Sequence, residues 1–300
     1  MKKYARNQID CLYKYSPIET AIKILKNGTF RYSSPTTFND PFDIQTELHF
    51  PFNIDQLAEL ILNRMNELIT DDINAVIDPN DSWGKIIIFL RKKYREGNYS
   101  LLNLKELIIP QLNYLCQIIE QTRVQYNQEW NEERKKIKIF CLSENYQNIL
   151  MWSHYAKYHT GVCFKLKVMP DKDNTICAAR KVNYSPQPPS FFTVKDWIDS
   201  VLINLKIDVG KVYREYPLIK SNIWKYEEEW RVWAPFDESH DKDYHDMPIY
   251  NDEIESIYIG AKADLELSKE VIQLAKNRGV ANFFQCFMNS KTYSLRFIKI

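Results

Sequence analysis

The sequence predicts an α+β protein with a mixed, mostly antiparallel sheet, continuous or split, and a helical insertion. Three observations predict this class. Short apolar and aromatic segments with the spacing of strands lie near both ends of the chain, as at residues 11–15. Apolar side chains recur at helical spacing through residues 54–135. The 300 residues include 7 glycines, and neither the P-loop nor the dinucleotide-binding glycine pattern occurs in the sequence.

The elements of the first zone, about residues 10–50, follow from apolar spacing and from turn-forming residues. They are a strand at 11–15, a helix from Ser16-Pro17 to Asn27-Gly28 and a second strand at 29–33. Pro35 breaks the second strand. The loop at 37–43 mixes turn formers with two phenylalanines, so we expect it to be packed against the protein.

The two later zones differ in their periodicity. Residues 54–135 are predicted to be helical, and residues 137–300 to alternate strands and helices. In the last zone, strands are predicted at 137–142, 162–168, 230–234, 254–259 and 293–300, and helices at 149–158 and 265–278. No internal repeat separates the zones. We therefore expect one α+β domain over residues 1–300, with a helical insertion at about 54–135.

Composition excludes several classes of protein. Lys and Arg number 40 against 39 Asp and Glu, so the net charge of +1 gives no overall attraction to nucleic acid or to an anionic membrane. The 6 cysteines are scattered without a C-x-x-C pair, which indicates reduced thiols in a cytosol. No signal core or 18-residue apolar run is present. We expect a cytoplasmic protein that has no contact with membranes.

The run from Trp224 to Arg231 combines aromatic rings with three adjacent carboxyls. If it enters a strand, Glu227 and Glu229 share a face and Glu228 points away. Two carboxylates on one face suit general acid–base work or stabilisation of a cationic sugar carbon. The alternative is a half-exposed turn entering a strand, in which each glutamate pairs with a lysine or with Arg231 at the surface.

The segment 148–156 is the second candidate. On a helix, Trp152 and Tyr155 share a face, while Ser153 and His154 project to its sides. Adjacent helical side chains diverge, so Ser153 and His154 do not form a triad, and a histidine here can equally be a structural hydrogen-bonding group. His154 and His159 are poorly aligned for a metal, and we expect none.

The third candidate is Asn39-Asp40, which lies between two phenylalanines. One interpretation has Asp40 orient Arg31 or His154 in a pocket, and the alternative is an Asx-turn. The basic segment 134–138 is expected to be a solvated helix end, or else a contact for phosphates.

Segments in a fixed order carry a resemblance to a known family. The N-terminal ones are Leu12-Tyr13-Lys14-Tyr15, residues 24–31, Ser33-Ser34-Pro35 and Phe38-Asn39-Asp40-Pro41-Phe42. The later ones are residues 140–143, Met151-Trp152-Ser153-His154-Tyr155, Gly161-Val162-Cys163-Phe164 and the run from Trp224 to Arg231. The chain resembles the uncharacterised bacterial domain-of-unknown-function 2971 family over nearly its whole length. That family name implies no activity.

A weaker resemblance is to the ADP-ribosyltransferase fold, in which a first strand bears Arg or His, a second Ser or Tyr, and a late strand a catalytic glutamate. Here the corresponding residues are Lys14 or Tyr15, then Ser33 or Ser34, and finally Glu227 or Glu229. The first strand thus has Lys14 and two tyrosines where that fold has Arg or His. The resemblance implies NAD as a substrate, with Tyr32, Phe38 or Trp152 stacking on its nicotinamide.

The resemblance therefore implies an NAD-using ADP-ribosyltransferase-like or NAD-cleaving enzyme, a stress or phage-defence effector with an unidentified protein or nucleic-acid target. Glu227 or Glu229 would stabilise the ribosyl cation, and His154 would help to position the substrate. The expected ligand-binding residues are Lys14, Tyr15, Arg31, Ser33, Ser34, Phe38, Asn39, Asp40, Trp152, Ser153, Tyr155, Tyr226 and Arg231. The alternative is a non-catalytic module whose aromatic and acidic cleft binds a nucleotide or a partner. A phosphodiesterase or nuclease is disfavoured because no metal-ligand spacing occurs.

Overall fold

The computed structural model describes residues 9–190, 192–235 and 242–300, which divide into two compact units. The first unit contains the described residues up to Thr46, Glu133–Pro188 and those from Pro217 onward. The second contains Glu47–Glu132 and the described part of Pro189–Tyr216. Each unit is described by itself below.

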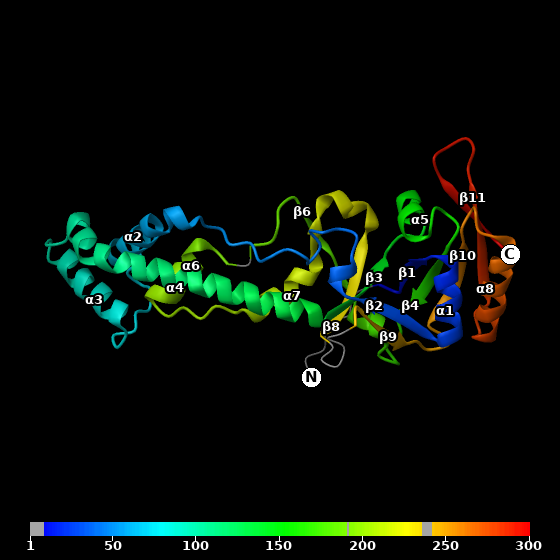
Figure 1. Ribbon diagram of the computed structural model, residues 1–300, viewed down its shortest axis with the longest axis horizontal. Helices are drawn as coiled ribbons and strands as arrows, with labels where there is room; N and C mark the ends of the chain where they lie inside the picture. Colours follow the sequence, from blue (N-terminus) through cyan, green and yellow to red (C-terminus); the bar gives the residue numbers. More distant parts are fainter. Residues whose placement is uncertain (1–8, 191, 236–241) are drawn as a thin grey trace. The chain divides into compact units, whose positions relative to one another are not determined.

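A ten-stranded sheet forms the first unit (Figure 1). Its main path runs through β12 (Leu295–Lys299), β11 (Asn282–Met288), β10 (Ile254–Ile259), β4 (Val162–Lys167), β1 (Cys11–Ser16), β3 (Ile137–Ser143), β2 (Thr29–Ser33) and β9 (Tyr244–Pro248). β8 (Glu229–Pro235) pairs with β3, and β5 (Arg180–Lys181) pairs with β8. The described pairings in this sheet are antiparallel, except for the parallel pair β10–β11. The predicted α+β class with a mixed, mostly antiparallel sheet is confirmed.

Helices cover both faces of this sheet. Successive side chains of a strand point to opposite faces, and here both faces carry apolar residues. α1 (Ile18–Asn27) and α8 (Leu265–Asn277) lie side by side and pack on the face that carries Leu12, Phe164 and Ile257 (Figure 1). Gly28, at φ 68°, ends α1 as predicted. α5 (Ile149–Tyr155) packs on the opposite face, which carries Tyr13, Tyr15, Cys163 and Tyr258.

The predicted helix at 149–158 is shorter than expected. It ends at Tyr155, and Lys157, Tyr158 and His159 have φ angles of 47°, 58° and 69°. Three successive left-handed residues cannot continue a right-handed helix. The chain instead turns sharply toward β4.

The sheet opens between β1 and β2. β3 pairs with β1 at one position, Tyr13 with Ser143, and with β2 at one position, Ser33 with Ile139. Along its other edge, β3 pairs with β8 from Ile137 to Ser143. Main-chain groups in the middle of β3 therefore face a gap on the side of β1 and β2.

A sharp corner precedes β8. The short 3₁₀ helices η3 (Tyr216–Leu218) and η4 (Asn222–Glu227) flank β7 (Ile219–Ser221), which pairs in parallel with β6 (Asn183–Ser185). Glu228 then adopts a φ of 46°, and β8 begins at Glu229. The run from Trp224 to Arg231 is therefore a turn that enters a strand, the alternative considered from the sequence, and Tyr226 lies in η4 before the strand begins. Two further single turns are η1 (Pro35–Thr37) and η2 (Thr175–Ala178).

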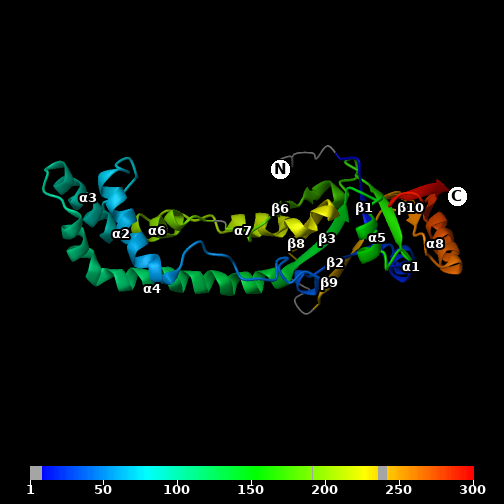
Figure 2. The same cartoon turned by 90° about the horizontal axis from the view of Figure 1, so that it is seen from above.

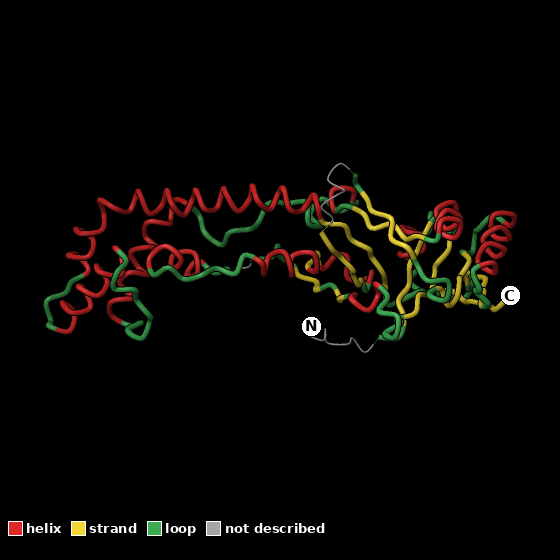
Figure 3. The backbone as a smooth tube through the Cα atoms, turned by 90° about the horizontal axis from the view of Figure 1, so that it is seen from below, coloured by secondary structure: helices red, strands yellow, loops and turns green. Residues whose placement is uncertain are grey.

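The second unit is helical (Figures 2 and 3). It contains α2 (Ile54–Thr70), α3 (Ser82–Arg95), α6 (Val194–Leu202), α7 (Gly210–Glu215) and most of α4 (Leu101–Lys136). Its core joins Leu57, Met65, Ile108, Leu115 and Ile198. The segment 189–216 belongs to this unit as well as the residues from 47 to 132. In the described parts of the chain, no helix combines the length and the apolar character needed to cross a bilayer.

Candidate functional site

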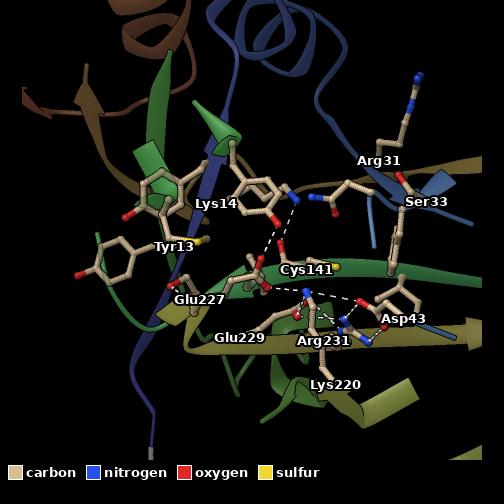
Figure 4. Close-up of a pocket in the computed structure, with 18 of the residues that line it drawn as sticks. Tyr13, Lys14, Arg31, Ser33, Asp43, Cys141, Lys220, Glu227, Glu229 and Arg231 are labelled. Atoms are coloured by element: carbon tan, nitrogen blue, oxygen red, sulfur yellow. Dashed lines mark hydrogen bonds and ion pairs between the residues drawn. The ribbon is translucent and has the colours of Figure 1, made fainter. Parts of the chain in front are cut away.

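A cavity of about 210 Å³ lies in the first unit where the sheet opens. Its walls come from β1, β2, β3, the loop at 37–43, α5, and the segment from Lys220 to Arg231. Phe38, Ile139 and Leu142 contribute apolar surface, while Ser33 and Asn39 contribute polar groups. Charged side chains are concentrated on the side formed by β8 and the turn before it (Figure 4).

Arg231 lies at the centre of this charged side and is fully buried. It bonds Glu229 through Nε at 2.8 Å and Nη2 at 3.0 Å, and Asp43 through Nη1 at 2.9 Å and Nη2 at 2.5 Å. Nη1 also donates to the Pro217 carbonyl at 2.8 Å. A guanidinium has five N–H donors, and these bonds use all of them. Arg231 therefore fixes the two carboxylates.

Lys220 brings the acids together. Its Nζ lies 2.5 Å from Glu227 Oε2, 3.1 Å from Glu229 Oε2 and 3.4 Å from Asp43 Oδ2. The three carboxylates raise its pKa, although burial alone would lower it. Lys220 thus stays charged and links Glu227 to Glu229 at the cavity wall.

Glu227 is held by groups from three elements. The Tyr155 hydroxyl of α5 donates to its Oε1, and Lys220 donates to its Oε2. Its carbonyl accepts from Ser143 Oγ at 2.7 Å. The left-handed Glu228 reverses the chain direction, so Glu227 and Glu229 both line the cavity while Glu228 does not. A turn therefore produces the pairing that a strand was expected to give.

The two glutamates differ in their proton affinity. Burial alone would raise the pKa of Glu229, but the charges of Arg231 and Lys220 lower it to about 2. Burial raises the pKa of Glu227, and the charge of Glu229 raises it further against the effect of Lys220. The neighbouring charges explain why the two pKa values differ. Glu229 bonds both Arg231 and Lys220, whereas Glu227 bonds Lys220 alone of the two cations. Carboxyls whose pKa values are pushed apart suit the two roles of an acid–base pair.

Lys14 lines the cavity opposite this cluster, as Figure 4 shows. Its Nζ donates to the Cys141 carbonyl at 2.9 Å and lies 5.0 Å from the centre of the Phe140 ring. That carbonyl is in the middle of β3, where the sheet opens. Burial lowers the pKa of Lys14, against the smaller opposing effects of Cys141 and Glu229. Burial also raises the pKa of the Cys141 thiol, which favours its neutral form.

A second cavity, of about 380 Å³, adjoins the first. The two share the lining residues Lys14, Tyr15, Arg31, Ser33 and Tyr155. The second cavity also meets the start of α1 at Ser16 and Pro17, and the exposed Lys23. The neighbouring cavities provide room for a ligand with two parts.

Ten of the sixteen predicted site residues line the first cavity. They are Lys14, Tyr15, Arg31, Ser33, Phe38, Asn39, Tyr155, Glu227, Glu229 and Arg231. The six that do not are Ser34, Asp40, Trp152, Ser153, His154 and Tyr226. Location in a cavity does not establish a role, so these assignments stay predictions.

Three of these six side chains have partners of their own. His154 is exposed, and its Nδ1 lies 2.9 Å from the Tyr226 hydroxyl. Ser153 does not meet His154, as expected, and its Oγ lies 3.1 Å from His159 Nε2. Asp40 orients neither Arg31 nor His154, because its Oδ1 accepts from the Phe42 amide at 2.9 Å, as in an Asx-turn.

Other side chains also differ from expectation. Arg31 points away from the charged cluster and pairs with Asp246 at 3.0 Å (Figure 4). The surface ion pair considered for Arg231 is instead a buried one. Trp152 and Tyr32 are buried in the cores on the two faces of the sheet, so among the three proposed stacking residues Phe38 lines the cavity. In the basic segment, Lys138 is buried and donates to the Lys135 carbonyl at 2.6 Å.

Sequence reasoning missed Asp43, Lys220 and Cys141. Asp43 lies in the loop at 37–43, in which Asn39 and Asp40 were the predicted site residues. Lys220 stands alone in an apolar stretch, and a lone charge among apolar residues is a signal that a buried partner exists. Cys141 contributes a main-chain carbonyl, for which its residue type gives no signal.

The three carboxylates of this site are paired with cationic side chains. In residues 9–190, 192–235 and 242–300, no three His, Cys, Asp or Glu side chains are arranged to hold a metal ion. Asp43, Glu227 and Glu229 instead share Lys220 and Arg231.

Comparisons with known proteins bear on part of this site. Residues 151–232 match the model of a family described as "Protein of unknown function (DUF2971)". The matched stretch includes the cavity residues Tyr155, Lys220, Glu227, Glu229 and Arg231. A comparison with curated proteins and one with solved structures each gave no match. The family match supports the resemblance to the domain-of-unknown-function 2971 family over those residues.

Proposed function

We propose that this protein cleaves the nicotinamide–ribose bond of NAD and passes the ADP-ribosyl group to water or to a macromolecular acceptor. The observation that carries the proposal is the pair Glu227 and Glu229, bridged by Lys220 at the wall of a cavity. Cleavage of such a bond passes through an oxocarbenium-like state. A fixed carboxylate beside the ribose stabilises that state.

Glu227 is the carboxylate that contacts the ribose in this proposal. The oxygens of Glu229 are engaged by Arg231 and Lys220, which neutralise its charge. Glu227 meets one cation and the Tyr155 hydroxyl. Its ionised form therefore retains more negative charge for the sugar. Glu229 acts as the positioning residue, because it holds Lys220 against Glu227.

The two cavities support a dinucleotide as the substrate class. In this arrangement nicotinamide and its ribose occupy the first cavity, where Phe38 offers an aromatic face. The remaining nucleotide lies toward the second cavity, which Lys23 and Arg31 line. Cationic side chains suit its phosphates. The proposed acceptor is a protein or nucleic acid, as expected of a stress or phage-defence effector.

The test is nicotinamide release from NAD, measured with the purified protein alone and with cell extract. Wild type is expected to release nicotinamide, and Glu227→Gln to lower the rate by about 100-fold or more, the scale of a lost acid–base group. The rate should fall as the pH drops through the raised pKa of Glu227, because the ionised form is the active one.

Glu228→Gln is the matched control, since Glu228 lies in the same turn but does not line the cavity. It should keep the wild-type rate. If wild type releases no nicotinamide under either condition and NAD does not shift its melting temperature, the proposal is wrong. Equal rates in wild type and Glu227→Gln would remove Glu227 from the mechanism.

One observation favours a second candidate, a non-catalytic nucleotide- or partner-binding module. Arg231 has all of its donors occupied by the protein itself, as a structural residue would. Binding of NAD without turnover, detected as a thermal shift with no nicotinamide released, would favour this candidate over the enzyme.

A further inference from the structure

Lys14 differs from the other cations of the first cavity. Arg31 pairs with Asp246, while Lys220 and Arg231 pair with the acids of the cluster. Within the described ranges, Lys14 has no carboxylate within ion-pair distance, and its one hydrogen bond goes to the Cys141 carbonyl. An unpaired ammonium surrounded by protein is costly, so this site favours the neutral amine.

Lys14 belongs to the lining of both cavities. Figure 4 shows its side chain among those that surround the first cavity. The sheet opening between β1 and β2 creates this place, because β3 leaves the Cys141 carbonyl free to accept from the lysine. A single hydrogen bond to a carbonyl orients an amine without neutralising it as a nucleophile.

We propose that Lys14 is a nucleophilic amine that forms an imine with a small aldehyde or ketone bound in the first cavity. Amines of this kind, desolvated in a protein cavity, are the ones that form Schiff bases with carbonyl substrates. This chemistry is distinct from nicotinamide release and does not depend on the proposed function.

The reaction balances without any redox partner. The nitrogen of Lys14 bonds to the carbonyl carbon, the carbon–oxygen bond breaks, and the oxygen leaves as water with the two hydrogens of the amine. The oxygen must be protonated as it leaves. Tyr155 also lines both cavities, and its hydroxyl is bonded to Glu227, the carboxyl whose pKa is raised. Glu227, which accepts the Tyr155 hydroxyl hydrogen, can therefore take up a proton of the amine through Tyr155 and return it to the leaving oxygen by the same route.

The lining of the first cavity defines the carbonyl compound. A volume of about 210 Å³ admits a small molecule. Ser33, Thr37 and Asn39 supply hydroxyl and amide groups beside apolar Ile139 and Leu142. These groups suit a short hydroxyaldehyde or the open-chain form of a sugar.

Reductive trapping tests the proposal. The full-length protein is treated with glycolaldehyde and cyanoborohydride at about pH 7, and the labelling rate of each lysine is followed by peptide mass spectrometry. The exposed Lys225 serves as the internal reference. Burial lowers the pKa of Lys14, which raises its share of neutral amine, so Lys14 is expected to label faster than Lys225.

Variants sharpen the test. Lys14→Arg should abolish the fast label and leave that at Lys225 unchanged, and Tyr155→Phe should slow labelling at Lys14 alone. Labelling of Lys14 no faster than Lys225 in the folded wild type would overturn the proposal.

Discussion

Arg231 is buried, pairs with two carboxylates and has a hydrogen-bond acceptor for each of its N–H groups. Taking ions out of water is costly, and the attraction among Asp43, Glu229 and Arg231 offsets that cost while all partners are present. Removing the cation leaves the acids buried together. The energetic importance of such a set therefore shows when one member is lost.

Arg231→Met is expected to lower the free energy of unfolding by about 3–5 kcal/mol, the scale for breaking a buried pair. Urea denaturation followed by circular dichroism measures this change. Arg31→Met is the control, because Arg31 and Asp246 form an exposed bidentate pair that contributes at most about 1 kcal/mol. A loss in Arg231→Met no larger than in Arg31→Met would show that the buried charges are not a stabilising unit.

Glu229 gives stability a dependence on pH. Its pKa in the folded protein is about 2, below the ordinary value of 4.5. The ionised form therefore stabilises the fold at pH values above that ordinary pKa. That contribution, about 3 kcal/mol, disappears as the pH falls from about 4 towards 2. Glu229→Gln should thus destabilise the protein near neutral pH and by less below about pH 4. Urea midpoints of wild type and Glu229→Gln, measured across this pH range, test the prediction. A difference between the two proteins that does not change with pH would contradict the lowered pKa of Glu229.

Residue types predicted the acids of the site better than the groups that hold them. Glu227 and Glu229 stood out because adjacent carboxyls and tryptophans are hard to reconcile with either core or surface. Their shared partner Lys220 is a single lysine beside apolar residues, and the sequence does not indicate that it pairs with these glutamates. Which side chains meet depends on the turn at Glu228 and on the opening of the sheet. Neither has a periodic signal in the sequence.

At the scale of elements, the corner between η4 and β8 determines which glutamates face the cavity. Glu228 adopts left-handed backbone there, its amide donates to the Lys225 carbonyl at 3.3 Å, and its own carbonyl accepts from the Glu144 amide at 3.1 Å. The Glu229 amide bonds the Tyr184 hydroxyl at 2.9 Å. These bonds fix the corner from both sides.

Substitutions at Glu228 test the corner. Glu228→Val is expected to destabilise the protein by about 1–2 kcal/mol, since a β-branched residue is strained at positive φ. Glu228→Gly accepts this φ freely and should be as stable as wild type or slightly more so. Thermal melting compares the two. If Val were tolerated as well as Gly, the left-handed conformation at this position would be wrong.

The elements found from the sequence are those with long periodic patterns. β4 alternates Val162, Phe164 and Leu166 with polar or small residues, so the strand and the face that it buries against α1 and α8 could be predicted. β5, β6 and β7 have two or three residues each, too few to show a period. β9 is a polar edge strand in which no residue is buried, so it lacks the apolar signal altogether.

At the scale of the whole molecule, the two units have separate hydrophobic cores. In the first unit, α1 and α8 pack on one face of the sheet and α5 on the other, while the core of the second unit joins α2, α3, α4 and α6. The helical unit also has its own buried ion pair, in which Arg64 bonds Asp199 at 2.7 and 2.9 Å. Cores that are independent in this way allow one unit to open while the other stays folded.

Arg64→Met tests that independence. Arg64 is 5% exposed and joins α2 to α6, so its loss leaves Asp199 buried without its cation and should cost about 3–5 kcal/mol within the helical unit. Hydrogen exchange followed by mass spectrometry should show lost protection in α2 and α6, with β4 and β10 still protected. Arg123→Met is the control, because its pair with Glu120 lies within α4 and is partly exposed. Equal loss of protection in β4 and β10 would mean that the two units unfold as one, and the ion pair would then stabilise the sheet that holds the candidate site as well.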